Sequence, residues 1–335
     1  MAAYTTIDDP SAYFQTAIYT GNGGSSQAVT FDGNSDMQPD WLWLKVRSHG
    51  GNHFAYDSVR GATKALVPND TDAEDTSYGY FSSFDSDGFT LGSSDNNVNG
   101  SGRTYVGWGW KKQAGVFDIQ TYTGNGSNRT ISHNLGAVPT MMITKVRSTT
   151  NQWLVYHQGI GNTNTVKIDD ASASTEQTNL WNSTTPTSSV FSVGTHTGSN
   201  LDGGTFVIYL FGDKQGVSKM GSYTGNGNAD GTFVYTGFKP AFVIRKVTSA
   251  SSDWIMQDNK RSESGGSNMI RNYLFPNSSQ AEVSSQDYFN IDFLSNGFKM
   301  RSTDGGANGS GSSYIYMAFA ENPFVTSTGV PATAR

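Results

Sequence analysis

The side chains best suited to chemistry are widely scattered along this sequence. Its five histidines are His49, His53, His133, His157 and His196. His49 and His53 are four residues apart, but they lie in a glycine-rich loop that enters a strand. In that setting the spacing does not place two metal ligands on one face. The chain has no cysteine, which excludes disulfides, thiolate metal sites and cysteine nucleophiles. We therefore expect no metal site.

Other reactive patterns fail on their local context. Gly100-Ser101-Gly102 lacks the strand, turn and helix of a nucleophile elbow. Gly21-Asn22-Gly23-Gly24 has no following lysine or helix to hold a phosphate. Asp85-Ser86-Asp87-Gly88 resembles the start of a calcium loop, but no glutamate follows at the required distance. We expect no enzymatic activity and no cofactor. A polysaccharide hydrolase is kept as a third hypothesis, because two carboxylates need only meet in space.

Two polar loops have the composition of a sugar-binding site. Sugars stack on tryptophan and tyrosine rings and bond to asparagine and aspartate. The candidate glycan contacts are Asn96, Asn97, Asn99, Asn179, Trp181 and Asn182. The alternative is packing, which we expect for Trp108 and Trp110 because alternating tryptophans on a strand fill a sandwich core.

The chain repeats one unit three times. Tyr-Thr-Gly-Asn-Gly occurs at Tyr19–Gly23, Tyr122–Gly126 and Tyr223–Gly227, at steps of 103 and 101 residues. Other landmarks recur in phase, among them a proline that opens an apolar run ending near a Lys-Val pair. A period of this length indicates repeated domains rather than a solenoid. Asn-Gly favours a tight turn, so we expect the pentapeptide to be structural.

Each apolar run is short, rich in β-branched and aromatic residues, and bounded by turn formers, which is typical of strands. In Trp41–Arg47 both alternating faces are apolar, so this strand must be covered on both sides. We predict an all-β fold of three tandem antiparallel β-sandwich domains, jelly-roll or lectin-like. The predicted boundaries are residues 19–115, 116–216 and 217–324.

The segments outside the repeats differ in character. Residues 1–18 form a predicted docking arm whose large apolar side chains are Tyr4, Ile7, Tyr13 and Phe14. An arm without a core of its own is expected to dock on the first domain or on a neighbouring protein. The alternative is an edge strand that completes the first sandwich. Residues 325–335 are predicted to be a loose tail.

Charge and hydropathy exclude two classes of partner. The 22 Lys and Arg residues against 28 Asp and Glu residues leave a net charge of −6, which argues against a nucleic-acid partner. No run approaches the roughly 18–20 apolar residues that a membrane helix needs, so we expect no membrane insertion. The start has no basic segment followed by an apolar run. We therefore expect a protein made in the cytosol.

Several segments together carry a family resemblance. They are residues 6–15, 19–23, 38–41, 57–64, 83–89, 104–110 and 314–320. This set resembles a domain of unknown function in virion structural and tail-fibre-like proteins of tailed phages from marine bacteria, cyanophages above all. The match is closest over residues 6–112 and looser in the later repeats, where the Asp57–Gly61 segment is lost. The resemblance implies a phage particle protein with a lectin-like sandwich, and it supplies no catalytic residues.

A long trimeric fibre needs a shaft of heptads or β-helical repeats, and neither is present. We therefore predict a non-enzymatic virion surface protein, either a capsid decoration or knob or a small tail appendage. Its partners would be other virion proteins of the capsid or tail. Three similar domains in one chain could imitate a trimer near a local three-fold axis. The alternative function is a tail-fibre or receptor-binding protein that recognises a host glycan.

Overall fold

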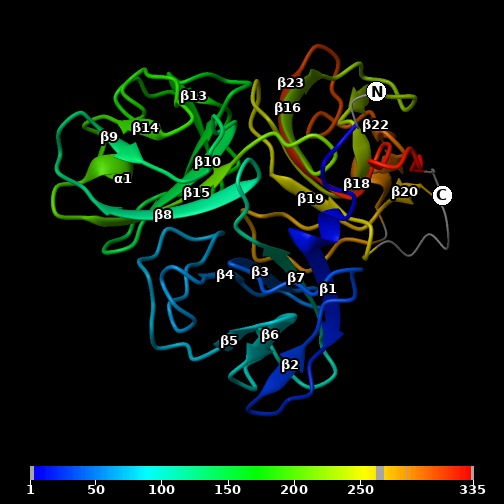
Figure 1. Cartoon of the computed structure of the whole chain (residues 1–335), viewed down its shortest axis with the longest axis horizontal. Helices are drawn as coiled ribbons and strands as arrows, with labels where there is room; N and C mark the ends of the chain where they lie inside the picture. Colours follow the sequence, from blue (N-terminus) through cyan, green and yellow to red (C-terminus); the bar gives the residue numbers. More distant parts are fainter. Residues whose placement is uncertain (1–3, 262–267, 285, 333–335) are drawn as a thin grey trace.

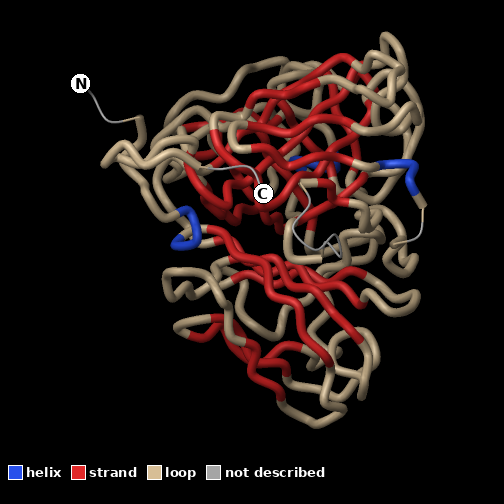
Figure 2. The backbone as a smooth tube through the Cα atoms, turned by 90° about the vertical axis from the view of Figure 1, so that its right-hand side faces the viewer, coloured by secondary structure: helices blue, strands red, loops and turns tan. Residues whose placement is uncertain are grey.

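The computed structural model of the chain describes residues 4–261, 268–284 and 286–332. Strands make up nearly all of its regular structure, and the helical segments are short pieces between them (Figure 2). The predicted all-β class is therefore confirmed. Residues 1–3 of the predicted arm and 333–335 of the predicted tail lie outside the described residues.

The strands fall into three groups, here called lobes, which surround a common centre (Figure 1). The first lobe contains the 3-10 helix η1 (Pro10–Ala12), β1 (Phe14–Thr20), β2 (Gln27–Val29), β3 (Trp41–Val46), β4 (His53–Asp57), β5 (Phe81–Asp85), β6 (Gly88–Leu91) and β7 (Thr104–Trp110). The second contains β8 (Phe117–Thr123), β9 (Arg129–Ser132), β10 (Met141–Val146), β11 (Leu154–His157), β12 (Asn164–Lys167), β13 (Thr175–Glu176), β14 (Val190–Val193), the helix α1 (Thr197–Asn200) and β15 (Thr205–Phe211). The third contains β16 (Ser218–Thr224), β17 (Phe233–Tyr235), β18 (Phe238–Val247), β19 (Ile255–Asp258), β20 (Met269–Ile270), the 3-10 helix η2 (Asp287–Phe289), β21 (Ile291–Leu294), β22 (Gly297–Met300) and β23 (Ser313–Pro323).

Each lobe combines two antiparallel sheets, here called larger and smaller; in the third lobe both have four strands, and the smaller sheet has the shorter strands. The larger sheets are β1-β7-β3-β4, β8-β15-β10-β11-β12-β13 and β16-β23-β18-β19. The smaller sheets are β2-β6-β5, β9-β14 and β17-β22-β21-β20. In every larger sheet the first strand of the lobe pairs with the last one: β1 with β7, β8 with β15 and β16 with β23. The last strand also pairs with the apolar strand at the recurring proline, which is β3, β10 or β18.

The larger sheets are apolar on both faces because both faces are covered. In β3, Leu42 and Leu44 point into the core between the two sheets of the first lobe. Trp41 and Trp43, on the opposite face, point to the centre of the molecule. Successive side chains of a strand alternate between faces, so one strand serves two cores. The expectation that this strand is covered on both sides is confirmed.

The central core is shared by all three lobes. Its members include Trp41 and Trp110 from the first lobe, Tyr209 from the second and Phe319 from the third. The Trp41 ring centroid lies 4.5 Å from that of Trp110 and 4.5 Å from that of Tyr209. Trp108 and Trp110 are completely buried, so the packing expectation for them is confirmed. The three lobes therefore do not form independent domains joined by linkers; they pack against one another around a shared core.

The tyrosine of the repeated pentapeptide is fixed by its ring and its hydroxyl. Tyr19 stacks on Tyr105 with the ring centroids 5.0 Å apart and donates a hydrogen bond to Val98 O (2.9 Å). The equivalent hydroxyl bonds are from Tyr122 to Ser199 O and from Tyr223 to Ala307 O. A buried tyrosine needs a partner for its hydroxyl, and here the partner comes from the far end of the same lobe.

The asparagine of the pentapeptide is held by a second asparagine far along the chain. Asn99 Oδ1 accepts from Asn22 N (2.9 Å), and Asn99 Nδ2 donates to Asn22 Oδ1 (3.0 Å). The equivalent pairs are Asn200 with Asn125 and Asn308 with Asn226. All three distal asparagines are fully buried. Each therefore ties the start of a lobe to its end.

The two glycines are required for separate reasons. A Cβ on Gly21 would lie 2.3 Å from Gly100 O, so only glycine allows this approach. Gly23 has φ +68°, a left-handed conformation that L side chains rarely adopt. The contacts account for the tyrosine, the asparagine and both glycines of the pentapeptide.

Loss of a distal asparagine is expected to destabilise the protein. Asn308 Nδ2 donates to Asn226 Oδ1, Asn228 O and Ser302 O at 2.8–2.9 Å. Asn308→Ala removes these three bonds and leaves the buried Ser302 O without this donor, so we expect a loss of about 2–3 kcal/mol in the free energy of unfolding. Denaturant titration measures it. Asn179→Ala, in an exposed loop, is the matched control and should change stability by less than about 0.5 kcal/mol; equal effects would refute the assignment.

The predicted boundary between arm and first domain falls inside a strand. β1 begins at Phe14, which pairs with Trp110 in the larger sheet of the first lobe. Phe14 is therefore a strand and core residue rather than part of a free arm. The alternative interpretation, an edge strand that completes the first sandwich, describes residues 14–18. The boundary was placed too late because the repeated pentapeptide lies at the end of the first strand, not at its start.

The start of the described arm docks on the third lobe of its own chain, whereas Asp9 and Ser11 bond to Ser35 of the first lobe. Tyr4 Oη donates to Gly237 O (2.9 Å), and Thr5 Oγ1 donates to Gln215 O (3.0 Å). Ile7 and Tyr13 pack against the central core. Tyr13 O accepts from Lys111 N of the first lobe (3.0 Å), so the expected docking on the first domain holds for Tyr13. It is corrected for Tyr4, which docks on the third lobe instead.

The C-terminal tail is not loose over its described part. Val325 and Pro331 form a β-bridge, and Ser327 N donates to Asp8 Oδ1 (2.6 Å). The predicted loose tail is therefore corrected for residues 325–332, which fold back on the arm. Its composition of Ser, Thr and Pro hid this turn.

Candidate functional site

The lobes meet through one set of contacts that is used three times. Glu74 N of the first lobe donates to Arg147 O of the second (2.8 Å). The equivalent bonds are from Ser174 N to Thr248 O and from Glu282 N to Arg47 O. Each lobe thus uses one surface for the preceding neighbour and another for the next. Such head-to-tail contacts generate a closed ring when the rotation closes. We call the contacts the first–second, second–third and third–first joints.

Ring nitrogens repeat the same geometry. Trp153 Nε1 donates to Val67 O across the first–second joint (3.0 Å). The equivalent contacts are Trp254 Nε1 to Lys167 O and His53 Nε2 to Phe275 O. The three joints are therefore related by an approximate three-fold axis through the central core.

Buried charges reinforce the first–second joint. Arg60 forms an ion pair with Asp57 in the same turn and reaches Glu74 through Nη1 (3.0 Å). Arg147 of the second lobe donates two hydrogen bonds of 2.8 Å to the Glu74 carboxylate. Tyr209 Oη of the same lobe donates to Asp57 Oδ2 (2.8 Å). Burial opposes ionisation of Glu74, but the hydrogen bonds from both arginines outweigh it and hold its pKa below the ordinary value.

The third–first joint has the same network. Arg261 binds Asp258 (2.6 Å) and Glu282 (2.7 Å), and Arg47 of the first lobe grips Glu282 with Nη2 (2.7 Å). Trp108 Nε1 takes the place of the tyrosine and donates to Asp258 Oδ2 (2.9 Å). The Asp57–Gly61 sequence is lost from the third repeat, as expected, but the aspartate and arginine that form the ion pair persist there as Asp258 and Arg261. The second, third and fifth residues of the segment differ between the two repeats.

The second–third joint replaces this network with neutral groups. His157 and Ile160 stand where the other joints have aspartate and arginine, and Ser174 and Thr248 replace the outer pair. His157 Nε2 lies 3.1 Å from Tyr316 O, and its Nδ1 accepts from the next-but-one backbone N–H. Because a carbonyl oxygen only accepts, Nε2 carries the proton and the ring is neutral.

Acid is expected to weaken the second–third joint. Burial lowers the pKa of His157 to about 4, against about 6.5 in an unfolded chain. The unfolded chain therefore binds this proton first as pH falls. The stability that His157 contributes is complete above pH 6.5, declines toward pH 4 and is then lost, a total of about 3 kcal/mol.

The measurement compares the wild type with His157→Gln by denaturant titration at pH 7, 5.5 and 4. We expect the difference in unfolding free energy to shift by about 3 kcal/mol in favour of the variant. Other buried histidines are common to both proteins and cancel. Parallel pH profiles for the two proteins would contradict the assignment.

The structure does not support two of the predicted glycan contacts. Trp181 is fully buried in the core of the second lobe, with its ring centroid 6.1 Å from that of Tyr156. Asn99 is fully buried and bonded to Asn22. Neither presents a surface to a sugar. The polar residues around Trp181 form a turn that covers the indole. The sequence alone does not distinguish such a turn from a loop that exposes the indole to a sugar.

The other predicted contacts lie on two separate loops. Asn96 and Asn179 are exposed, while Asn97 is half-buried and bonds to Asp95. Asn182 has a left-handed φ of 51° in its turn. Within the described ranges, no hydrogen bond joins the loop of the first lobe to that of the second. The structure therefore does not assemble the six predicted residues into one site.

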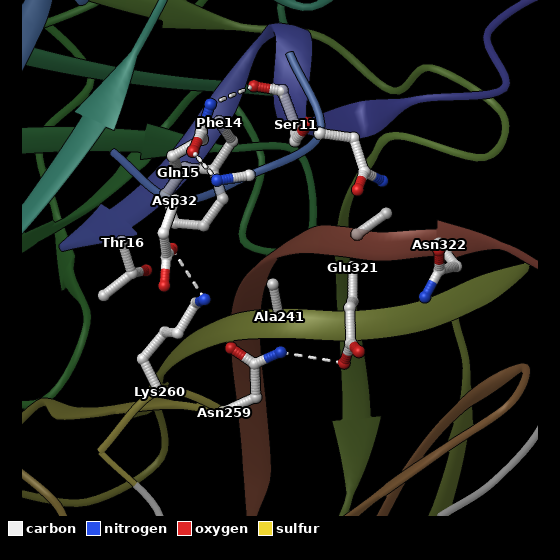
Figure 3. Close-up of a pocket in the computed structure, with 13 residues that line it drawn as sticks. Ser11, Phe14, Gln15, Thr16, Asp32, Ala241, Asn259, Lys260, Glu321 and Asn322 are labelled. Atoms are coloured by element: carbon white, nitrogen blue, oxygen red, sulfur yellow. Dashed lines mark hydrogen bonds and ion pairs between the residues drawn. The ribbon is translucent and has the colours of Figure 1, made fainter. Parts of the chain in front are cut away.

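A polar groove lies elsewhere, at the third–first joint (Figure 3). Its volume is about 240 Å³, and it runs between β1 of the first lobe and β18 and β23 of the third. Lys260 Nζ binds Asp32 Oδ1 (2.7 Å) on one side, and Asn259 Nδ2 donates to Glu321 Oε2 (2.8 Å) on the other. Phe14 also lines it, and is the predicted site residue that the groove includes.

No described group of three or more His, Cys, Asp or Glu residues is arranged to hold a metal ion. In the described part of the chain, no helix has the length and apolar character to cross a membrane.

The fold and its joints define one unit of three two-sheet lobes around a common core. Residues 9–323 match, as a single stretch, the family model described as Domain of unknown function (DUF7483). The chain belongs to this family. The family unit therefore spans all three lobes rather than one. No curated protein matches the sequence.

Proposed function

We propose that the protein is a non-enzymatic component of a phage particle surface that acts by shape and docking. The observation that supports this is the closed ring of three joints, in which one chain imitates a three-fold assembly. Buried polar groups are used to hold the lobes together: arginine–carboxylate networks occupy two joints, and bonded asparagines close each lobe. Such a body is rigid and presents the outer loops of its lobes.

An object with approximate three-fold symmetry fits a site of three-fold symmetry. On a particle, three equivalent partner surfaces around a local three-fold axis would each meet a similar lobe. This arrangement favours a capsid decoration or knob over a long fibre, because the described chain has neither heptads nor a β-helical shaft.

The test is to locate the protein on purified phage particles that carry its gene, by cryo-electron microscopy and by labelling of intact particles. We expect density for the three-lobed body on the outside, with its approximate axis on or beside a local three-fold axis. Absence of the protein from purified particles would refute the particle assignment. Density far from any such axis would refute the three-fold docking.

A further inference from the structure

The groove at the third–first joint lies where the second–third joint has a side-chain contact between its two lobes. In the second–third joint, Gln158 follows β11 and its Nε2 donates to Met220 O of β16 (2.6 Å). The residue equivalent to Gln158 in the third lobe is Asn259. The backbone N–H of each donates to an equivalent carbonyl in its own lobe, Thr140 O and Ala241 O. The asparagine side chain is one methylene shorter and bonds to Glu321 instead. The space between the lobes therefore stays open.

A second substitution leaves an unused hydroxyl on the wall of the groove. Thr16 pairs with Trp108 in β1, the same register in which Met220 pairs with Met317 in β16 and Ile119 with Tyr209 in β8. The first lobe thus has threonine where the other lobes have apolar core residues. Thr16 is only 4% exposed, and its Oγ1 is buried with no hydrogen-bond partner. A buried hydroxyl without a partner costs free energy, which a ligand hydroxyl would recover.

The charges of the groove are balanced and close together. Asp32 binds Lys260 (2.7 Å), and Glu321 binds Lys239 (3.1 Å). The wall therefore offers acceptors and donors side by side without an excess of either sign. Ligands with a strong net charge gain little from such a surface, whereas hydroxyl groups, which both donate and accept, match it. The volume of about 240 Å³ lies just below the range of roughly 300–1,000 Å³ typical of sites for drug-sized ligands.

We propose that this groove binds one neutral sugar unit, with the hydroxyl of Thr16 bonded to a sugar hydroxyl. The apolar floor formed by Phe14, Ala241 and Ala320 suits the C–H face of a sugar ring, and the carboxylates and amides suit its rim. A zwitterionic amino acid is the competing occupant. The proposal is independent of the particle assignment, since a groove binds its ligand wherever the protein is located.

The test is titration of the full chain with free glucose, galactose, mannose and N-acetylglucosamine, followed by saturation-transfer and chemical-shift NMR. Glycine is titrated as the zwitterionic probe. We expect at least one sugar to bind with a Kd on the order of 1 mM, and glycine not to bind. Thr16→Val replaces the hydroxyl with a methyl group and should weaken binding roughly three- to tenfold.

Two further variants rebuild the packed arrangement of the second–third joint. Thr16→Met and Asn259→Gln should each abolish detectable binding by filling the groove. Asn96→Ala and Asn179→Ala are the matched controls in the loops favoured by composition, and should leave the Kd unchanged. Thermal unfolding of each variant verifies its fold; if Thr16→Met does not fold, the valine and glutamine variants still decide.

Three results would overturn the proposal. The first is that no sugar binds up to 100-fold above the expected Kd. The second is that sugar binding survives the groove variants or is lost in the loop controls. The third is that glycine binds and the sugars do not.

Discussion

Arg60→Met is expected to lower the free energy of unfolding by about 3–5 kcal/mol. Arg60 and Asp57 are both completely buried, so removal of the guanidinium leaves the aspartate charge without its partner. Glu74 also loses one of its two arginines, and the first–second joint loses its centre. Desolvation of an uncompensated charge is the main cost, and it exceeds the value of the ion pair itself.

The chain supplies its own control for this result. The second–third joint performs the same task with histidine and isoleucine, so Asp57→His with Arg60→Ile should restore at least half of the lost stability. Arg271→Met removes an exposed pair at 3.9 Å from Asp287 and should cost less than about 1 kcal/mol. Denaturant titration at pH 7 measures all three. If the single and double variants are equally unstable, the unpaired charge is not the cause.

Trp41→Ala is expected to cost about 3–5 kcal/mol and to destabilise all three lobes together. The indole is 1% exposed, stacks on Tyr209 of the next lobe and packs at a tilt against Trp110 of its own lobe. Its removal opens a cavity where the three larger sheets meet. Because this core is shared, no lobe keeps its inner face covered when another unfolds.

Two measurements test this expectation. Calorimetry should show one unfolding transition in the wild type and one, at lower temperature, in the variant. Trp41→Phe should lose well under half as much stability, because the Trp41 Nε1 makes no hydrogen bond that the change would break. Separate transitions, with only the first lobe shifted, would show that the lobes are energetically independent.

Much of the architecture can be predicted from the order of residues. The recurring pentapeptide marks the three lobes because each of its glycines has a separate steric or conformational requirement and its asparagine bonds to a buried asparagine at the end of the lobe. The two apolar faces of Trp41–Val46 reveal burial on both sides, since alternation assigns each face separately. Neither pattern shows what covers each face of the strand, because the core inside a lobe and the core shared by the lobes are both apolar.

The site residues were less predictable because composition does not report exposure. Trp181 and Asn99 lie in polar stretches, yet both are buried, one by its turn and one by a distant asparagine. The groove depends on Thr16, Asn259 and Glu321, which come from opposite ends of the chain. The available signal was the threonine in place of Ile119 and Met220, three residues before the tyrosine of each pentapeptide; the strand register confirms that the three positions are equivalent.

The sequence by itself determined the class of fold and the three-part division, because these depend on local periodicity and on turn chemistry that repeats. Only the tertiary structure decided that the parts close into a ring, that the start of the arm binds its own third lobe, and that one joint remains open. Those outcomes depend on small differences between equivalent side chains, such as one methylene between Asn259 and Gln158. Such differences act only when two lobes are placed face to face.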